Sequence, residues 1–253
     1  MQPGVEAAIS AGGVGVVTLI GTLAAQYFGR RATSRDIEKT LKQQSEQLDR
    51  TLTEQRTRTL NERFATAADR LGEDKPAAVR LAGVYAMAGL ADDWPENQQT
   101  CIDVLCAYLR LPYERDPGDE VSVARWLAFR ASREVRHTVI RVITAHLRQG
   151  AATSWQGHDF DFTGVVFDGG DFSGAVFSGG QVSFHHTEFS GGLVSFGGAV
   201  FSGGQVDFVR AVFSGGQVDF SRPGDWSFPP AFPWTDRPPA GVKLRKKEDQ
   251  SQT

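Results

Sequence analysis

Phenylalanine recurs with a regular spacing in the last third of the chain. Twelve of the 17 Phe residues lie between Phe160 and Phe220. The spacing starts with steps of five residues and then alternates between seven and five. Such self-similarity is typical of a solenoid, in which each unit packs on its neighbours. We predict that the Phe residues that set this spacing form the structural core of the repeats: Phe162, Phe167, Phe172, Phe177, Phe184, Phe189, Phe196, Phe201, Phe208, Phe213 and Phe220.

A second position follows the same rhythm, two residues before most of these Phe residues. It holds a small or β-branched side chain, at Val165, Ala175, Val182, Thr187, Val194, Ala199, Val206, Ala211 and Val218. Because residues i and i−2 of a strand face the same side, the pattern predicts short strands with both marked side chains turned inward. Ser-Gly-Gly turns separate several units, as at residues 178–180 and 202–204, and glycine supplies the positive φ of a sharp corner.

These units resemble the pentapeptide-repeat family, whose repeats read roughly A-(D/N)-(L/F)-(S/T)-G. The best matches are residues 170–174 (GDFSG) and 175–179 (AVFSG). The resemblance implies a right-handed β-helix, usually four-sided, with the central residue pointing into the axis. The seven-residue steps depart from the family pattern by placing two extra residues in alternate corners. They leave the cross-section of the coil open.

The N-terminal segment is apolar. Residues 7–28 carry no charged side chain, and about 20 apolar residues span a bilayer. Arg30, Arg31 and Arg35 follow directly, which places the C-terminal side in the cytoplasm by the positive-inside tendency. We therefore predict a transmembrane anchor over residues 1–29, with a single pass through the cell membrane and a cytoplasmic C-terminal body. The alternatives are a glycine-rich buried helix and a leader peptide.

A long polar helix is predicted over residues 30–60. They contain many good helix formers and neither Gly nor Pro. Ile37, Leu41, Leu48 and Leu52 form a thin apolar stripe, with steps closer to an eleven-residue period than to a heptad. One interpretation is a coiled-coil stalk that forms a homodimer below the membrane. The alternative is a single solvated helix, or one laid against the next domain.

Residues 61–150 predict a helical module. Helices over residues 61–71, 77–90, 96–111 and 120–149 with short connections are typical of a bundle or a HEAT-like stack. In the last helix we expect five inward side chains: Trp126, Phe129, Val139, Ile143 and Leu147. Residues 63–86 resemble the helical region that precedes the repeats in membrane-anchored actinobacterial pentapeptide-repeat proteins, which implies a bacterial membrane protein.

Together these segments predict an α+β fold. A transmembrane helix and a long helix come first, followed by a small helical bundle and a pentapeptide-type β-helix over residues 151–221. Residues 222–253 are expected to form a Pro-rich cap with a disordered tail. The cap would use the aromatic residues of this segment to cover the open end of the solenoid: Trp226, Phe228, Phe232 and Trp234.

Charge and cysteine content narrow the function further. The net charge of −3 is uneven, because residues 151–221 contain seven acids and one Arg, a net −6. Cys101 and Cys106 are five residues apart, which does not place them on one helix face. We expect buried free thiols, which suit a reducing compartment.

No residue pattern predicts a catalytic, cofactor or metal site. Asp207 and Asp219 are single outward carboxylates without a general-acid partner. His185 and His186 are adjacent, so their side chains point to opposite faces of a strand and are poorly placed to bind one metal ion. We therefore expect a non-enzymatic protein without a cofactor.

Four arginines fall on one side of the last long helix: Arg130, Arg133, Arg141 and Arg148. Such a stripe could meet phospholipid headgroups, nucleic acid or the acidic repeats. We predict a solvated face with local ion pairs.

The function predicted from sequence is a membrane-anchored scaffold that presents a β-helix to an unidentified protein partner in the cytoplasm. Outward positions such as Gln205, Asp207, Gln217 and Asp219, or the helical module, would carry it. The alternative, by analogy with some pentapeptide-repeat proteins, is a DNA-mimic regulator of a type II topoisomerase, and the charge of −6 favours it. The eleven Phe-centred units make fewer than three four-sided coils, which at ~4.8 Å per coil is short for a DNA-length rod. We do not expect nucleic acid as a partner.

Overall fold

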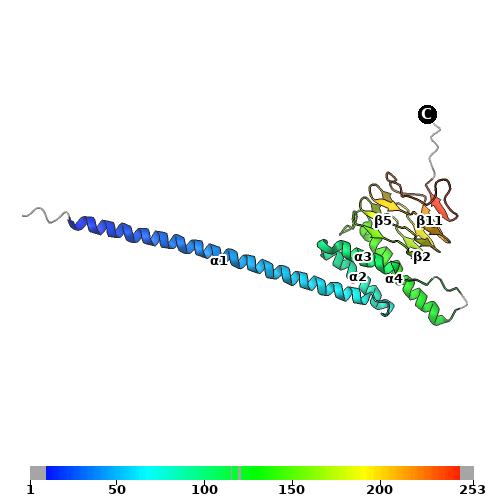
Figure 1. Cartoon of the computed structure of the whole chain (residues 1–253), viewed down its shortest axis with the longest axis horizontal. Coiled ribbons are helices and arrows are strands. Elements are labelled where there is room, and N and C mark those ends of the chain that lie inside the picture. The colour runs from blue at the N-terminus through cyan, green and yellow to red at the C-terminus, as the bar shows by residue number, and fades with distance from the viewer. Residues whose placement is uncertain (1–9, 115, 119–120, 246–253) are drawn as a thin grey trace, which may run out of the picture. The chain divides into compact units, whose positions relative to one another are not determined.

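The computed structural model describes residues 10–114, 116–118 and 121–245, with side chains from residue 37 onward (Figure 1). The chain divides into two compact units, Met1–Thr59 and Leu60–Thr253, and each is considered by itself.

The first unit is helical. It is occupied by α1 (Ser10–Arg70), whose last residues belong to the second unit. The predicted anchor over residues 1–29 falls on positions that are outside the structure or have no described side chains. Over the part of the chain that is described, no helix combines the length and the apolar character that crossing a bilayer requires.

The second unit begins with the helical module. After the end of α1 come α2 (Ala77–Asp93), the short 3₁₀ helix η1 (Pro95–Asn97), α3 (Gln98–Arg110) and α4 (Val123–Leu147). Pro95 begins a new helical turn after α2 ends, as proline near a helix start does. The Ser122 hydroxyl caps α4 by accepting a hydrogen bond from the Arg125 N–H. Helices α2, α3 and α4 pack on one another.

The repeats form a solenoid with four faces and about four turns. Its strands are β1 (Phe160–Asp161), β2 (Val166–Phe167), β3 (Gly170–Asp171), β4 (Val176–Phe177), β5 (Gln181–Ser183), β6 (Glu188–Phe189), β7 (Leu193–Ser195), β8 (Val200–Phe201), β9 (Gln205–Asp207), β10 (Val212–Phe213), β11 (Gln217–Phe220) and β12 (Val242–Leu244). All pairings between these strands are parallel. The faces are β1-β5-β9, β2-β6-β10, β3-β7-β11-β12 and β4-β8.

This topology resolves the cross-section that the sequence left open. Each seven-residue step lies at a wide corner, either between the β4-β8 face and the β1-β5-β9 face or between the β2-β6-β10 face and the β3-β7-β11-β12 face. The five-residue steps lie at the other, tight corners, except that the step from Phe167 to Phe172 turns from β2 to β3 in the first coil without the two extra residues. The extra two residues therefore alternate around the coil without breaking the register of the strands.

The axis of the solenoid is filled by stacked rings. Phe184 stacks on Phe162 at 5.0 Å and on Phe208 at 4.4 Å between ring centroids. Ten of the eleven spacing Phe residues are at most 2% exposed, and Phe213 is half-buried. The residues two positions earlier are also buried, which confirms the inward pairing predicted from the strand period.

The segment after the regular repeats completes a last, irregular coil. Trp226 packs on Phe201 with a ring distance of 5.1 Å, and Phe232 stacks on Phe208 at 5.4 Å. Strand β12 pairs with β11 on the same end. The sequence estimate of fewer than three coils was too low, because it counted only units centred on Phe. Phe228, which we expected in the cap, is instead 58% exposed.

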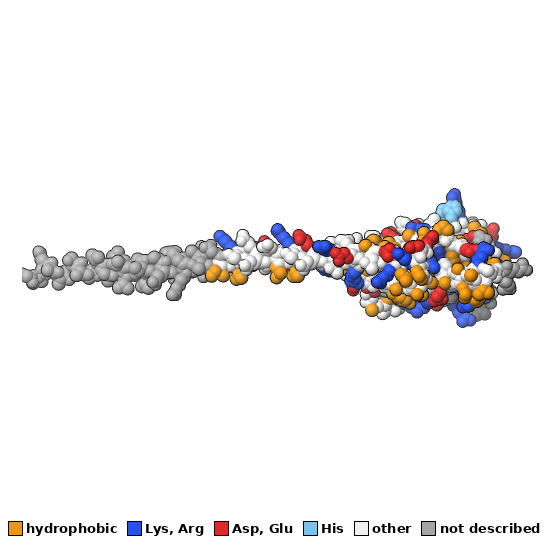
Figure 2. Space-filling view, turned by 90° about the horizontal axis from the view of Figure 1, so that it is seen from below, with side chains coloured by type: hydrophobic (Ala, Val, Ile, Leu, Met, Phe, Trp, Pro, Cys, Tyr) orange, Lys and Arg blue, Asp and Glu red, His pale blue; other side chains and the backbone are white. Residues whose placement is uncertain are grey.

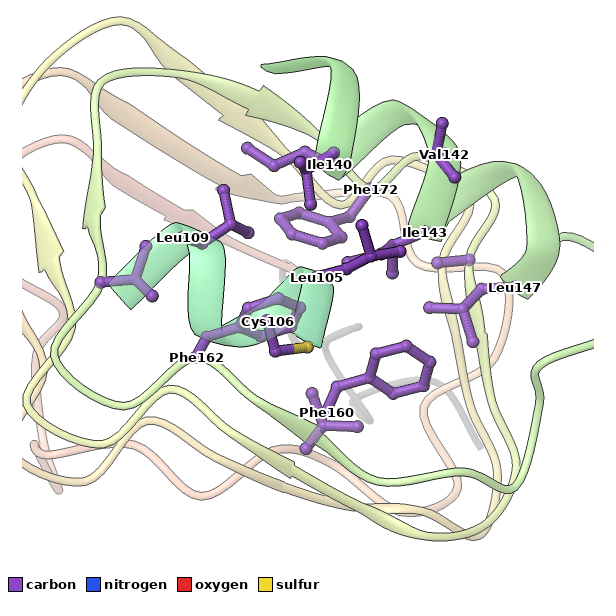
Figure 3. Packing of buried hydrophobic residues seen from close by; sticks show 14 of the residues in the cluster. Leu105, Cys106, Leu109, Ile140, Val142, Ile143, Leu147, Phe160, Phe162 and Phe172 are labelled. Atoms are coloured by element: carbon purple, nitrogen blue, oxygen red, sulfur yellow. The ribbon is translucent and has the colours of Figure 1, made fainter. Parts of the chain in front are cut away.

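Helices α3 and α4 cover the opposite end of the solenoid, where they contact β1 and β3 (Figure 3). Leu105 and Ile143 from these helices belong to the same buried cluster as Phe162 and Phe172 of the first coil. The module and the solenoid thus share one hydrophobic core, and neither end of the Phe stack is left open.

Cys101 and Cys106 are free and buried in this core, as predicted. Burial raises the pKa of the Cys101 thiol to about 11 and that of Cys106 to about 12. A thiol with so high a pKa is a poor nucleophile.

One expected core residue of α4 lies on the surface. Phe129, Val139, Ile143 and Leu147 are buried, but Trp126 is 38% exposed. The first turns of α4 keep an apolar outer side, which also includes Val123 and Leu127. The helical period alone did not reveal this, because it orients side chains without showing how far the neighbouring elements extend.

Candidate interaction surface

The acids that precede Phe on two faces of the solenoid take part in tight turns. In each turn the side-chain oxygen accepts a hydrogen bond from the backbone N–H two residues later. Four aspartates do so with Oδ1: Asp161 to Thr163 (3.0 Å), Asp171 to Ser173 (2.9 Å), Asp207 to Val209 (2.6 Å) and Asp219 to Ser221 (2.8 Å). Ser183 and Ser195 do the same with Oγ. The tight corners therefore need a short acceptor at this position, which Asx and Ser turns provide.

The order of these residues from coil to coil separates like charges. Ser183 lies between Asp161 and Asp207 on one face, and Ser195 lies between Asp171 and Asp219 on another. Carboxylates directly opposite on neighbouring strands would repel each other. Serine makes the same turn without the charge, so the two acids of each face stay two coils apart.

Cations from the two caps lie beside three of these acids. Arg110 of α3 lies 2.6 Å from Asp161, and Arg148, directly after α4, lies 3.9 Å from Asp171. At the other end, hydrogen bonds from Ser221 and then the charge of Lys243 hold the pKa of Asp219 below its ordinary value. Asp219, which we predicted as a functional outward residue, thus has structural partners, and Asp207 is used in its own turn.

A partly buried polar cluster lies between α4 and the first coil. The Asp168 carboxylate accepts hydrogen bonds from the Tyr113 hydroxyl (2.7 Å), from Arg133 Nε (2.8 Å) and from His137 Nε2 (2.9 Å). Burial by itself would raise the pKa of Asp168. The bonds from His137 and Tyr113 and the charge of Arg133 outweigh it and lower the pKa to about 2.

Tyr113 and Arg136 belong to the same cluster. Burial, together with the hydrogen bond to Asp168, raises the pKa of Tyr113. Arg136 is only 4% exposed, donates to the Leu109 and Val166 carbonyl oxygens, and lies over the Tyr113 ring at 4.2 Å. Because the Asp168 oxygens are engaged by three donors, the cluster is suited to joining the module to the repeats rather than to accepting a proton from a substrate.

The arginine stripe is only in part the solvated face with local ion pairs that we predicted, because Arg133 and Arg148 pair with acids of the repeats. Arg133 pairs with Asp168, Arg141 pairs with Glu134 at 2.6 Å, and Arg148 donates to the Ser173 carbonyl oxygen at 3.1 Å. Arg130 differs, because its guanidinium lies 4.8 Å from the centre of the Trp126 ring. Sequence reasoning missed this cation–π contact. The four-residue spacing of Trp126 and Arg130 on a helix could have suggested it.

Two open hollows flank the Arg133–Asp168 pair. One of about 490 Å³ is lined by Trp126, Arg130 and the Gly191 corner, among other residues. The other, of about 480 Å³, is lined by His137, Arg141 and Leu193, among other residues. Both lie between the outer side of α4 and a wide corner of the solenoid. We call this surface the α4 groove; its open form suits a segment of another macromolecule better than an enclosed small molecule.

The two adjacent histidines lie at a tight corner on the outside of the solenoid. Their rings meet edge to face at 4.4 Å. His186 has φ +53° and Arg210, one coil later, has φ +61°, while Gly164 holds the equivalent corner of the first coil with φ +72°. In the described part of the chain, no group of three or more His, Cys, Asp or Glu side chains is placed to hold a metal ion.

Comparison with family models matches residues 162–212 to pentapeptide repeats (9 copies). Comparisons with curated proteins and with solved structures returned no match. The match covers the repeats alone. The resemblance of the helical region to membrane-anchored actinobacterial proteins stays a prediction.

Proposed function

Residues 162–212 are pentapeptide repeats, and from this premise we propose that the protein is a non-enzymatic, membrane-anchored interaction protein. The observation that carries the proposal is the solenoid capped at both ends, with its interior filled by Phe rings and its tight corners held by side-chain acceptors. Such a body offers a rigid outer surface and places its function there.

The α4 groove is the part of this surface that best suits a protein partner. Trp126 and Arg130 are of the residue types that dominate binding energy at protein interfaces. Leu193, on the opposite side of the groove, is 51% exposed. The ion pair of Arg133 with Asp168 holds the groove floor in place, so that little ordering would be needed on binding.

Crosslinking from membranes tests this proposal. Blue-native gels of the full chain should show a discrete complex, and the variant Trp126→Ala with Arg130→Ala should lose it. Tyr85→Ala is the matched control, because Tyr85 is an aromatic residue that is 59% exposed and does not line the groove. A wild-type chain that migrates as a lone monomer and captures nothing would count against the proposal.

The membrane anchor is part of the same proposal. Residues 7–28 lack charged side chains, and three arginines follow by residue 35. A reporter fused after Thr253 should therefore read cytoplasmic, and carbonate should fail to extract the protein from bacterial membranes. Extraction into the soluble fraction would contradict the single-pass anchor while leaving the groove proposal open to its own test.

The placement of the acids supports this function over DNA mimicry. A DNA mimic needs rows of exposed negative charge, whereas Asp161 and Asp171 have cationic neighbours and the Asp168 side chain is 13% exposed and paired with Arg133. Addition of the protein at micromolar concentration to a type II topoisomerase supercoiling assay should leave the enzyme active. Strong inhibition would favour the alternative.

A further inference from the structure

The exposed stripe of α1 is built from two copies of one eleven-residue unit. Residues 37–47 read IEKTLKQQSEQ and residues 48–58 read LDRTLTEQRTR. The units share an aliphatic residue at the first position, an acid at the second, a basic residue at the third, Thr-Leu at the fourth and fifth, and Gln at the eighth. The eleven-residue period is therefore shared by polar positions as well as by the apolar ones.

An eleven-residue unit spans three helical turns, so its equivalent residues return to nearly the same side of the helix. Ile37, Leu41, Leu48 and Leu52 are 54%, 60%, 58% and 53% exposed. Figure 2 shows hydrophobic side chains gathered in two patches along one side of the described part of α1. The side opposite the stripe carries charged residues such as Lys39, Glu46 and Arg50 and suits solvent.

We propose that residues 37–58 of α1 bind the same residues of a second copy of this chain, in parallel and in register. The argument for a second copy is periodicity. A helix that packs along an eleven-residue stripe must present the same period, and a second copy of α1 does so over its whole length. Within the Met1–Thr59 unit, each of the four apolar side chains remains more than half exposed, so the stripe is available to a partner.

The polar residues of the stripe select the register. Gln44 and Gln55 lie beside the apolar pairs on the same side of the helix. A glutamine amide both donates and accepts, so two of them at one level satisfy each other. A shift by one repeat would leave half of the apolar residues without a partner. In-register parallel pairing is the arrangement in which every apolar layer and every glutamine layer meets its own kind.

Two repeats make a short interface, so the pair is expected to depend on protein concentration. The four apolar side chains of each helix are already partly shielded by their own helix, and association costs translational and rotational freedom. Confinement to a membrane would raise the local concentration, but the pairing itself does not require the anchor.

A single cysteine tests orientation and register together. In the full chain expressed in bacteria, Leu48→Cys should give a disulfide-linked dimer on mild oxidation, because residue 48 meets its own copy only in a parallel, in-register pair. Glu46→Cys, on the side opposite the stripe, is the control and should crosslink at least tenfold less. The native Cys101 and Cys106 are 0% exposed and should not contribute. Equal crosslinking of both variants would overturn the proposal. A variant with both Leu41→Cys and Leu48→Cys gives a further check. If crosslinks between residue 41 of one copy and residue 48 of the other exceeded those of Leu48→Cys alone, the pair would be antiparallel or shifted, and the proposal would be overturned.

Sedimentation of the purified full chain gives a second readout. The variant Leu41→Lys with Leu52→Lys should halve the mass observed for the wild type at high concentration, while Lys39→Glu should leave it unchanged. A wild type that is monomeric at every concentration, together with absent Leu48→Cys crosslinking, would exclude the pair. That outcome would not change the result of the topology reporter. The pairing of α1 and the membrane anchor can therefore be excluded separately.

Discussion

The Asp168 carboxylate accepts hydrogen bonds from three side chains that lie 31 to 55 residues away in the sequence. Tyr113 comes from the loop before α4, and Arg133 and His137 come from α4 itself. At this scale the helical module and the repeats are joined by charge and hydrogen bonding as well as by apolar packing. Loss of one donor would leave the largely shielded Asp168 carboxylate with fewer hydrogen bonds.

The lowered pKa of Asp168 makes stability depend on pH. A carboxyl whose pKa falls from 3.8 to about 2 on folding stabilises the folded state above pH 4, and that contribution is lost as the pH falls toward 2. The shift corresponds to about 2 kcal/mol at neutral pH. Denaturant unfolding from pH 7 to 2 should show this loss in the wild type and a smaller one in Asp168→Asn. An unchanged pH dependence in the variant would mean that Asp168 does not carry the effect.

Two residues at the tight corners carry backbone strain. His186 and Arg210 have left-handed φ values, which cost most side chains about 1 kcal/mol, whereas glycine adopts them freely. Replacing either by Gly should raise the free energy of unfolding by about 0.5 kcal/mol net, since glycine also loses more entropy on folding. Gly164→Ala, at the equivalent corner, should destabilise in chemical denaturation. Destabilisation by both glycine variants would show that these side chains make contacts that outweigh the strain.

At the scale of elements, the wide corners of the solenoid stack backbone directly on backbone. A Cβ added to Gly216 would lie 2.4 Å from the Gly192 carbonyl oxygen, and this residue also has φ +71°. A Cβ added to Gly191, in the preceding coil, would have no neighbour within 4 Å among the described residues, and Gly191 has no positive φ. The Ser-Gly-Gly corners are therefore not uniform, and only some of their glycines are required by close packing.

This difference gives a matched pair of variants. Gly216→Ala should lower the free energy of unfolding by about 2 to 3 kcal/mol, because backbone atoms must shift to admit the methyl group. Gly191→Ala should change it by no more than about 0.5 kcal/mol. Thermal unfolding of both variants checks the pair. Equal melting temperatures would contradict the stacked-corner geometry.

At the scale of the whole second unit, the solenoid depends on its caps. Helices α3 and α4 cover the first coil, and Trp226, Phe232 and β12 cover the last. A stack of Phe rings with an open end would expose apolar surface and unpaired strand edges, which favour association between chains.

Truncation after residue 221 should therefore expose Phe201 and Phe208, which Trp226 and Phe232 cover. We expect aggregation and increased binding of a hydrophobic dye. Truncation after residue 245 is the control, since it keeps the last coil. Light scattering of both proteins distinguishes them, and a soluble, dye-negative product from the shorter chain would show that the last coil is dispensable.

The spacing of residues determined the solenoid by itself. A strand alternates its faces with a period of two, so Phe184 and Val182 had to point the same way wherever the chain lay. The alternating steps of seven and five after Phe177 likewise placed two extra residues in alternate corners. These properties are local, and so they can be predicted from neighbouring residues.

Tertiary structure decided what the local pattern does not contain. The role of Asp161 depended on both its turn and Arg110, which lies 51 residues earlier. Trp226 and Phe232 extend the solenoid beyond the regular spacing. Their rings pack on those of Phe201 and Phe208, although neither residue continues the steps of five and seven. Trp126 is exposed because the first turns of α4, which also hold the exposed Val123 and Leu127, are not covered by other elements of the described chain. The sequence determined which side chains form the stack, whereas contacts between distant segments decided how the stack ends and which outer residues are left for a partner.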